Sequence, residues 1–274
     1  MGKINGRDIV IKVSDVTICY DDLGESTTPV IFIHGFPFDK SSWKPQMDFL
    51  SKQYRVIAYD IRGFGKSTSG SEEADISLFA DDLLLFMDLL EIQKAIICGL
   101  SMGGYIVLNA VSRYPDRFSA MILSDTQCIA DTNEVKEKRK QSIDKINGGG
   151  LVEYVDGFVN AIFYKDTIAQ RKELVDEIRN VILATEPLII TSALTALARR
   201  WETCSALPAI TIPCLILCGS DDKITPPEQA EYMKVHIADS VLHLINNSAH
   251  MSNLENPTEF NRYLKDFLSG IQNI

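Results

Sequence analysis

The apolar residues of this 274-residue chain fall into short continuous runs that alternate with longer mixed stretches. Val30–Ile33, Ala95–Cys98 and Cys214–Cys218 are continuously apolar, which is typical of strands buried on both faces. The stretches Ser77–Leu90 and Met102–Arg113 are predicted to be helices that follow or precede such strands. Repeated strand–helix alternation predicts a mostly parallel sheet covered by helices on both faces.

Two regions depart from this alternation. Ile9–Val13 and Val16–Tyr20 alternate apolar and polar residues, as an antiparallel pair at a sheet edge does. Residues 127–207 contain predicted helices only, so we expect a helical cap inserted between two strands of a core formed by residues 1–126 and 208–274. The alternative is a peripheral helical decoration far from any site. The predicted cap helices are Asp131–Ile146, Leu151–Phe163, Ile168–Thr185 and Pro187–Arg199.

The charge of the chain limits its partners. Lys and Arg number 27 against 37 Asp and Glu, which gives a net charge of −10. An acidic surface argues against nucleic acid and anionic membranes as partners. We therefore expect a small-molecule partner, with no nucleic acid and no membrane, for a protein that is a monomer or a homodimer.

The N-terminal residues and the cysteines bear on location. Residues 1–6 lack the apolar segment of a signal peptide, and no apolar run is long enough to span a bilayer. The six cysteines show neither a Cys-x-x-Cys pattern nor metal-type spacing with histidine. These features predict a cytoplasmic protein with reduced cysteines and no metal site. The cysteines are Cys19, Cys98, Cys128, Cys204, Cys214 and Cys218.

The most informative motif is Gly-x-Ser-x-Gly at Gly99–Gly103, between a predicted strand and a predicted helix. This context matches a nucleophile elbow, in which a tight turn lifts the hydroxyl of Ser101 out of the backbone. Glycine is needed at both ends because the neighbours of the serine must lack bulk. The helix that begins there points its N–H groups at the same space. The motif therefore predicts attack on a carbonyl and stabilisation of the oxyanion that forms.

A serine nucleophile needs a base, and the chain has only four histidines. His236 falls in a predicted helix and His243 in a predicted strand, while His34 directly follows a buried strand. His250 lies in a polar loop after a strand, where α/β sheets place active groups. We therefore predict that His250 is the base.

The base needs an acid that orients it. Asp221 and Asp222 follow the apolar run Cys214–Cys218 and precede a helix. Either carboxylate fits this role, because aspartate is also a common residue that simply bounds such turns.

With these motifs in order, the chain resembles the α/β-hydrolase superfamily over almost its full length. It is most similar to the branch of 3-oxoadipate enol-lactonase-like hydrolases and small carboxylesterases. The stretches that carry the resemblance are His34–Phe38, Asp60–Ser67, Gly99–Gly104, Gly219–Pro226 and His250–Pro257.

The resemblance implies an α/β-hydrolase fold, with a mostly parallel eight-stranded sheet flanked by helices and an inserted helical cap. It also implies the chain order Ser, Asp, His for the catalytic residues. In such families the acid precedes the proline of the turn by four residues, which selects Asp222. An oxyanion hole is implied from the backbone N–H groups of Phe36 and Met102, whose side chains would also line the acyl pocket. Neither a metal nor an organic cofactor is implied.

These residues predict a serine hydrolase that cleaves a small carboxylic ester or lactone through an acyl-serine intermediate. Three alternatives remain open: a carbon–carbon bond hydrolase, a cofactor-free perhydrolase, and a ligand receptor with a vestigial hydrolase site. Steady turnover distinguishes the receptor from the enzymes.

The cap is expected to set the substrate preference. Gln127, Phe158 and Phe163 are candidates for the pocket lining, beside Phe36 and Met102. A dedicated enol-lactonase needs a cation for the carboxylate of its substrate. Candidates for that cation are Arg139, Arg199 and Arg200, each expected to be a solvated helix charge.

Overall fold

The computed structural model describes residues 5–26 and 28–271. Most of the N-terminal segment considered above, residues 1–4, lies outside this range. Within the described residues, eight strands form one sheet in the order β1-β2-β4-β3-β5-β6-β7-β8. The strands are β1 (Gly6–Val13), β2 (Val16–Leu23), β3 (Val30–Ile33), β4 (Val56–Tyr59), β5 (Ala95–Leu100), β6 (Phe118–Ser124), β7 (Cys214–Gly219) and β8 (Ser240–Ile245).

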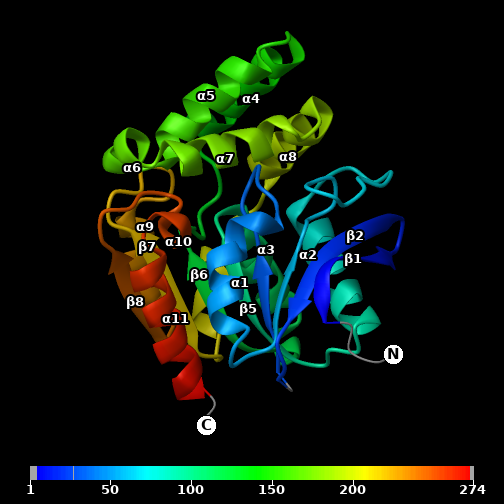
Figure 1. The fold of residues 1–274 in the computed structure, drawn as a ribbon, viewed down its shortest axis with the longest axis vertical. Coiled ribbons are helices and arrows are strands. Elements are labelled where there is room, and N and C mark those ends of the chain that lie inside the picture. Colours follow the sequence, from blue (N-terminus) through cyan, green and yellow to red (C-terminus); the bar gives the residue numbers. More distant parts are fainter. Residues whose placement is uncertain (1–4, 27, 272–274) are drawn as a thin grey trace.

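The helices connect these strands and cover the sheet (Figure 1). The α-helices are α1 (Lys44–Leu50), α2 (Ile76–Leu89), α3 (Met102–Arg113), α4 (Asn133–Asn147), α5 (Leu151–Ile162), α6 (Lys165–Gln170), α7 (Lys172–Leu183), α8 (Pro187–Arg199), α9 (Pro227–His236), α10 (Ser252–Glu255) and α11 (Pro257–Ile271). The 3-10 helices are η1 (Lys40–Trp43), η2 (Pro115–Arg117) and η3 (Cys204–Ala209).

The apolar runs occupy the middle of the sheet. Every residue of β3, β4, β5 and β7 is buried, because helices cover both faces there. Only β1 and β2 add antiparallel pairings, and from β4 onward the neighbours are parallel. The predicted α/β-hydrolase fold with a mostly parallel eight-stranded sheet is confirmed.

The strand order reverses around β3, which lies between β4 and β5. In the β3–β5 pairing Ile33 is opposite Gly99, so the chain leaves both strands at the same edge of the sheet. Loops at such a reversal form the crevice in which open α/β sheets bind ligands. The topology therefore brings the loop that begins at His34 beside Ser101.

Helices α4–α8 form a helical insertion between β6 and β7 and lie together over one end of the sheet (Figure 1). The insertion is hydrogen-bonded to the loop that carries His250: the His250 N–H donates to the carbonyl of Ile162 at 2.9 Å. The Tyr164 N–H donates to the carboxylate of Glu255 at 2.7 Å. One side of the insertion is thus fixed directly to a predicted site loop.

One predicted helix of the insertion is wrong. The structure divides Ile168–Thr185 into α6, which begins earlier at Lys165, and α7. Arg171 lies at the break in a non-helical conformation, and its guanidinium donates to the carbonyls of Leu254 and Glu255 at 3.0 and 2.8 Å. These contacts with a segment more than 80 positions away compete with helix continuity, and a sequence pattern does not reveal them.

The expectation that all cysteines are reduced is wrong for two of them. A disulfide joins Cys128 and Cys204, while Cys19, Cys98, Cys214 and Cys218 are free and buried. The bridged cysteines lie where the chain enters and leaves the helical insertion, and the Thr203 N–H donates to the Cys128 carbonyl at 2.8 Å.

Within the described residues, no single helix is long and apolar enough to cross a membrane. Helices α7 and α8 meet those criteria only as a pair, and that pair is bent by 93°.

Candidate active site

Ser101 lies on a strained turn between β5 and α3. Its backbone φ of 52° falls in a region that residues with a side chain rarely adopt. The turn leaves no room for bulk on either side: a Cβ at Gly99 would lie 2.3 Å from the Gly103 backbone, and one at Gly103 would lie 2.3 Å from the Ile33 carbonyl oxygen. The two glycines of the motif are therefore required by close backbone contact, as the nucleophile-elbow pattern predicts.

The structure brings Ser101, His250 and Asp222 into one hydrogen-bonded chain. His250 Nε2 lies 2.8 Å from Ser101 Oγ, and His250 Nδ1 lies 2.8 Å from Asp222 Oδ2. The hydroxyl of Thr225 donates to the same carboxylate oxygen at 2.7 Å. When Nδ1 carries the imidazole proton and donates it to Asp222, Nε2 is free to accept from the serine hydroxyl.

The neighbouring backbone fixes the Asp222 side chain. Its Oδ1 accepts from the N–H groups of Ile224 at 2.8 Å and Thr225 at 3.1 Å. Asp221 is exposed, and its carboxylate accepts from the hydroxyl of the neighbouring Ser220 at 2.8 Å. Of the two aspartates, it is therefore Asp222 that reaches His250.

Burial and charge act in opposite directions on this pair. Burial disfavours the charged form of His250, but the Asp222 carboxylate outweighs that effect and raises the pKa of the imidazole. Burial likewise acts to raise the pKa of Asp222, while the attraction of His250 and the hydrogen bonds from His250 and Thr225 lower it overall. Each group thus stabilises the charged form of the other.

The other three histidines lie in different environments. His34 is fully buried: its Nδ1 bonds to the Gly35 carbonyl and its Nε2 accepts from the Ile61 N–H at 3.0 Å, so it braces the loop after β3. His236 bonds to a carbonyl of its own helix. His243 stacks on Tyr263 with ring centroids 3.8 Å apart.

The loop after β3 places a backbone N–H group beside Ser101. A Cβ at Gly35 would lie 3.2 Å from the Cβ of Ser101, so the Gly35–Phe36 peptide passes directly against the serine. Met102 is the first residue of α3, where helix N–H groups have no partner within the helix. In the described part of the chain, the N–H groups of Phe36 and Met102 donate to no protein acceptor.

Aromatic side chains surround this loop. Phe158 of α5 packs edge-on against Phe36 with ring centroids 6.0 Å apart, and it also packs on Phe38 at 6.3 Å. Met102 is buried and Gln127 half-buried, just beyond β6. The helical insertion therefore supplies an apolar contact, through Phe158, to the loop after β3 that carries Phe36 and Phe38.

Phe163 is buried and directly follows Ile162, whose carbonyl accepts from the His250 N–H. It lines a hollow together with Tyr164, Lys165 and Ala249, the residue before His250.

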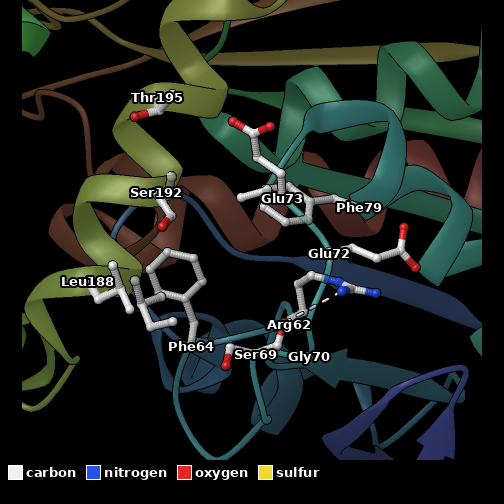
Figure 2. Close-up of a pocket in the computed structure, with 13 residues that line it drawn as sticks. Arg62, Phe64, Ser69, Gly70, Glu72, Glu73, Phe79, Leu188, Ser192 and Thr195 are labelled. Atoms are coloured by element: carbon white, nitrogen blue, oxygen red, sulfur yellow. Dashed lines mark hydrogen bonds between the residues drawn. The ribbon is translucent and has the colours of Figure 1, made fainter.

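A pocket of about 270 Å³ lies between α8 and the segment 62–74 (Figure 2). Its walls mix apolar side chains such as Leu188 and Phe79 with the hydroxyls of Ser192 and Thr195. Phe64 also lines it, and the ring of Phe64 packs edge-on against Phe36 at 6.4 Å. One aromatic residue therefore connects this pocket with the loop beside Ser101.

The pocket also contains charged groups (Figure 2). Glu72 and Glu73 lie on its lining. The guanidinium of Arg62 forms ion pairs with Asp82 at 2.6 Å and with Asp15 at 3.2 Å.

The three arginines considered for a substrate carboxylate all have acidic partners. Arg139 and Arg200 both bind Asp131, at 2.5 and 2.6 Å, and Arg199 pairs with Glu73. The expectation of a solvated charge is wrong for Arg200, which is buried.

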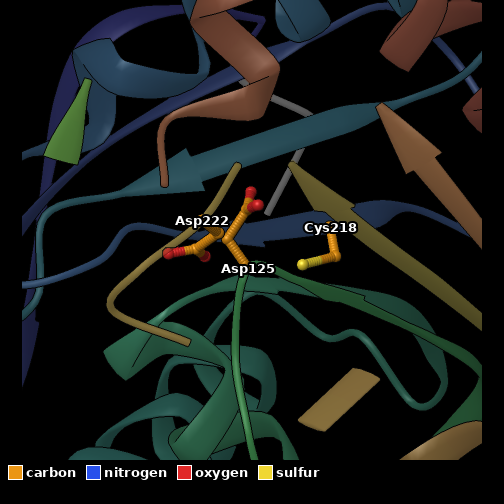
Figure 3. Close-up of side chains that lie close together, drawn as sticks. All are labelled: Asp125, Cys218 and Asp222. Carbon is orange, nitrogen blue, oxygen red and sulfur yellow. The ribbon is translucent and has the colours of Figure 1, made fainter. Parts of the chain in front are cut away.

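Sequence reasoning missed a second buried carboxylate near the site. Asp125 follows β6 and is fully buried (Figure 3). One of its oxygens lies within 4.8 Å of a carboxylate oxygen of Asp222 and of Cys218 Sγ. Asp125 directly follows an apolar strand, which is the signal that made Asp221 and Asp222 candidates, but this position does not show which groups Asp125 contacts.

Comparison with known proteins agrees with this arrangement. A family model described as the alpha/beta hydrolase fold matches residues 28–257. The chain is 30% identical over 256 residues to 3-oxoadipate enol-lactonase 1 of Acinetobacter baylyi, covering 90% of this chain and 91% of that protein.

Solved structures give the same result. A thermophilic esterase from Thermogutta terrifontis superimposes with a TM-score of 0.92 at 30% identity, over 96% of this chain and 99% of that one. The enol-lactonase from Burkholderia xenovorans LB400 gives 0.89 at 27% identity, over 95% and 100%. The chain belongs to the α/β-hydrolase family and is similar to its enol-lactonases and esterases.

Proposed function

We propose that this protein is a serine hydrolase that cleaves small carboxylic esters or lactones through an acyl-serine intermediate. The observation that carries the proposal is the unbroken chain of 2.8 Å contacts from Ser101 through His250 to Asp222. The strained turn that presents Ser101, and the relatives named above, give it independent support.

In the proposed acylation step, His250 Nε2 takes the hydroxyl proton as Ser101 Oγ attacks the carbonyl carbon of the substrate. Asp222 stabilises the imidazolium that forms. The carbonyl oxygen becomes an oxyanion and accepts hydrogen bonds from the N–H groups of Phe36 and Met102, each worth about 10²–10³-fold in kcat at such sites. The alcohol then leaves with the proton from Nε2.

Deacylation repeats the same steps with water. His250 takes a proton from a water molecule as that water attacks the acyl carbon, and a second oxyanion occupies the same place. Collapse of this intermediate returns the proton to Ser101 Oγ and releases the carboxylic acid.

We further propose that the preferred substrates are uncharged at the acyl end. The wall made by Phe36, Phe38 and Phe158 is apolar, and Arg139, Arg199 and Arg200 already bind carboxylates of the protein. A substrate carboxylate would have to displace Asp131 or Glu73 from these arginines, whereas an apolar acyl group needs no such exchange.

Hydrolysis of p-nitrophenyl acetate, butyrate and octanoate tests the proposal, with the mono-p-nitrophenyl ester of succinic acid as an anionic match for butyrate. We expect steady multiple turnover, best on the short neutral esters, and a loss of about 10⁶-fold in kcat in Ser101→Ala. Ser112→Ala, on the exposed side of the same helix, is the matched control and keeps wild-type rates.

The outcomes separate the alternatives. A single burst without turnover would favour a receptor, and rates equal to those of Ser101→Ala would favour carbon–carbon bond cleavage. Equal rates on succinate and butyrate esters would overturn only the preference for uncharged acyl groups.

A further inference from the structure

Asp125 occupies a place between the two loops that carry Asp222 and His250. It follows β6 with a φ of 44°, and its own N–H donates to the carbonyl of Leu217 on β7 at 2.8 Å. A left-handed backbone at a residue other than glycine is uncommon, and it persists where surrounding contacts fix it. Its side chain lies between those of Asp222 and Cys218 (Figure 3).

The two oxygens of this carboxylate bond to different loops. Oδ1 accepts from the N–H of Gly219, at the start of the loop that carries Asp222, at 2.8 Å. Oδ2 accepts from the hydroxyl of Ser252, two residues after His250, at 2.6 Å, and from that of Ser124 at 2.9 Å. A single side chain therefore joins the end of β6 to both loops.

We propose that Asp125 is a positioning residue: it holds the Asp222 and His250 loops in register, and its charge stabilises the imidazolium of His250 during the reaction. The inference rests on the proposed serine hydrolase function. Asp125 acts through His250 and needs no contact with substrate.

The charges around Asp125 support this role. It faces Cys98 on β5, Cys218 and Asp222 on β7 and its following loop, and His250 after β8. Burial and the nearby Asp222 raise the pKa of Asp125 to about 7, against the opposing attraction of His250. The Asp125 carboxylate in turn contributes to the raised pKa of His250. The charge of each group therefore affects the protonation of the other.

The negative charge of Asp125 determines the direction in which this residue shifts the pH dependence of activity. A negative Asp125 favours the protonated form of His250, so it moves the acid limb of the activity profile to higher pH. Removing that charge leaves His250 neutral, and able to act as a base, at lower pH. The same change withdraws support from the imidazolium that forms in the transition state, so the plateau rate falls.

The test is the pH dependence of kcat/KM and kcat in Asp125→Asn, from pH 5 to 9. Phenyl acetate is the substrate, because the absorbance of phenol is constant over this range. Asparagine keeps the shape and can still accept from Gly219 and donate to Ser252. We expect the acid limb to move down by about one pH unit and the plateau kcat to fall by about 3- to 10-fold.

Three further variants complete the test. Asp125→Ala removes both loop contacts and is expected to lower the plateau by about a further 10-fold. Ser252→Ala removes one contact, keeps the buried carboxylate, and is expected to move the limb in the same direction by a smaller amount. Asp221→Asn makes the same chemical change at an exposed neighbour of Asp222 and leaves the profile unchanged.

An acid limb of Asp125→Asn that coincides with the wild-type limb overturns the proposal, and so does an unchanged profile in Ser252→Ala if the other variants do not fold. If Ser101→Ala instead hydrolysed phenyl acetate as fast as the wild type, the proposed function itself would be refuted. The two failures are therefore distinguishable.

Discussion

The sheet and the helical insertion each bury an aspartate, and the two are held by different partners. In the loop that follows β7 of the sheet, Asp222 bonds to an imidazole and to the hydroxyl of Thr225. In the insertion, Asp131 bonds to the guanidinium groups of Arg139 and Arg200. Both carboxylates have a pKa below the usual value, because these partners outweigh the opposing effect of burial.

The difference lies in what the partner can do. A guanidinium stays charged at every pH that proteins experience, so the Asp131 cluster exchanges no proton near neutrality. An imidazole gains and loses its proton there, so the Asp222 pair is able to do acid–base chemistry. The identity of the partner, more than burial, separates a structural anchor from a candidate catalytic group.

The location of Arg200 supports the structural role. Its guanidinium also donates to the carbonyls of Leu197 and Ile129, and it lies over the ring of Tyr105 at 4.2 Å. These contacts join the end of α8 to the segment that enters the insertion, beside the disulfide of Cys128.

Of the substitutions that test this comparison, Asp222→Asn is expected to have the largest effect, because it changes the partner of His250. The N–H groups of Ile224 and Thr225 would hold the amide oxygen, so the NH₂ group would face His250 Nδ1. That imidazole nitrogen would then become the acceptor, and Nε2 would carry the proton and no longer accept one from Ser101. We expect kcat for p-nitrophenyl acetate to fall by about 10³–10⁴-fold.

Asp221→Asn is the matched control and should change kcat less than 2-fold or so, because that side chain is exposed. If kcat of Asp222→Asn were less than about 10-fold lower than that of the wild type, the assigned role would be contradicted. This conclusion requires that the variant and the wild type unfold at the same urea concentration.

On the structural side, Asp131→Asn should reduce stability and leave the chemistry largely intact. The substitution leaves Arg200 buried without a negative partner, which typically costs about 3–5 kcal/mol in the free energy of unfolding. Urea denaturation measures that loss, and kcat for the folded variant should stay within about 5-fold of the wild type.

Glu73→Gln provides the contrast, because its ion pair with Arg199 is exposed on both sides. Such a pair contributes at most about 1 kcal/mol. If Asp131→Asn and Glu73→Gln destabilise the protein equally, the buried cluster is not the anchor described above.

The sequence was most informative where chemistry lies at the ends of apolar strands. Continuous apolar runs indicated the buried strands β3, β5 and β7, and the loops just after them include His34, Ser101 and Asp222. Asp125 has the same position after β6, but its role depends on Ser252, which lies 127 positions later. A strand pattern predicts where a loop begins and leaves its partners unspecified.

The helical insertion was harder to predict for a related reason. Helical patterns identified α4, α5 and α8 closely, yet they did not show which charged side chains turn inward. Arg200 meets Asp131 across 69 positions, and Cys128 meets Cys204 across 76. Such pairings are fixed by how the helices pack, which local sequence does not encode.

The smallest expected effect concerns the point where the two regions meet, at Phe158. Its ring reaches from α5 to Phe36 and Phe38 beside Ser101, with centroid distances of 6.0 and 6.3 Å. Phe158→Ala removes this apolar wall, so a butyrate ester should lose about 10-fold in kcat/KM, chiefly through KM. An acetate ester is shorter and should lose less, whereas Val152→Ala, exposed on the same helix, should change neither. If kcat/KM for the acetate and butyrate esters falls by the same factor, and the fall lies in kcat, Phe158 supports the loop of Phe36 and does not contact the acyl group. The insertion then affects the chemistry through packing alone.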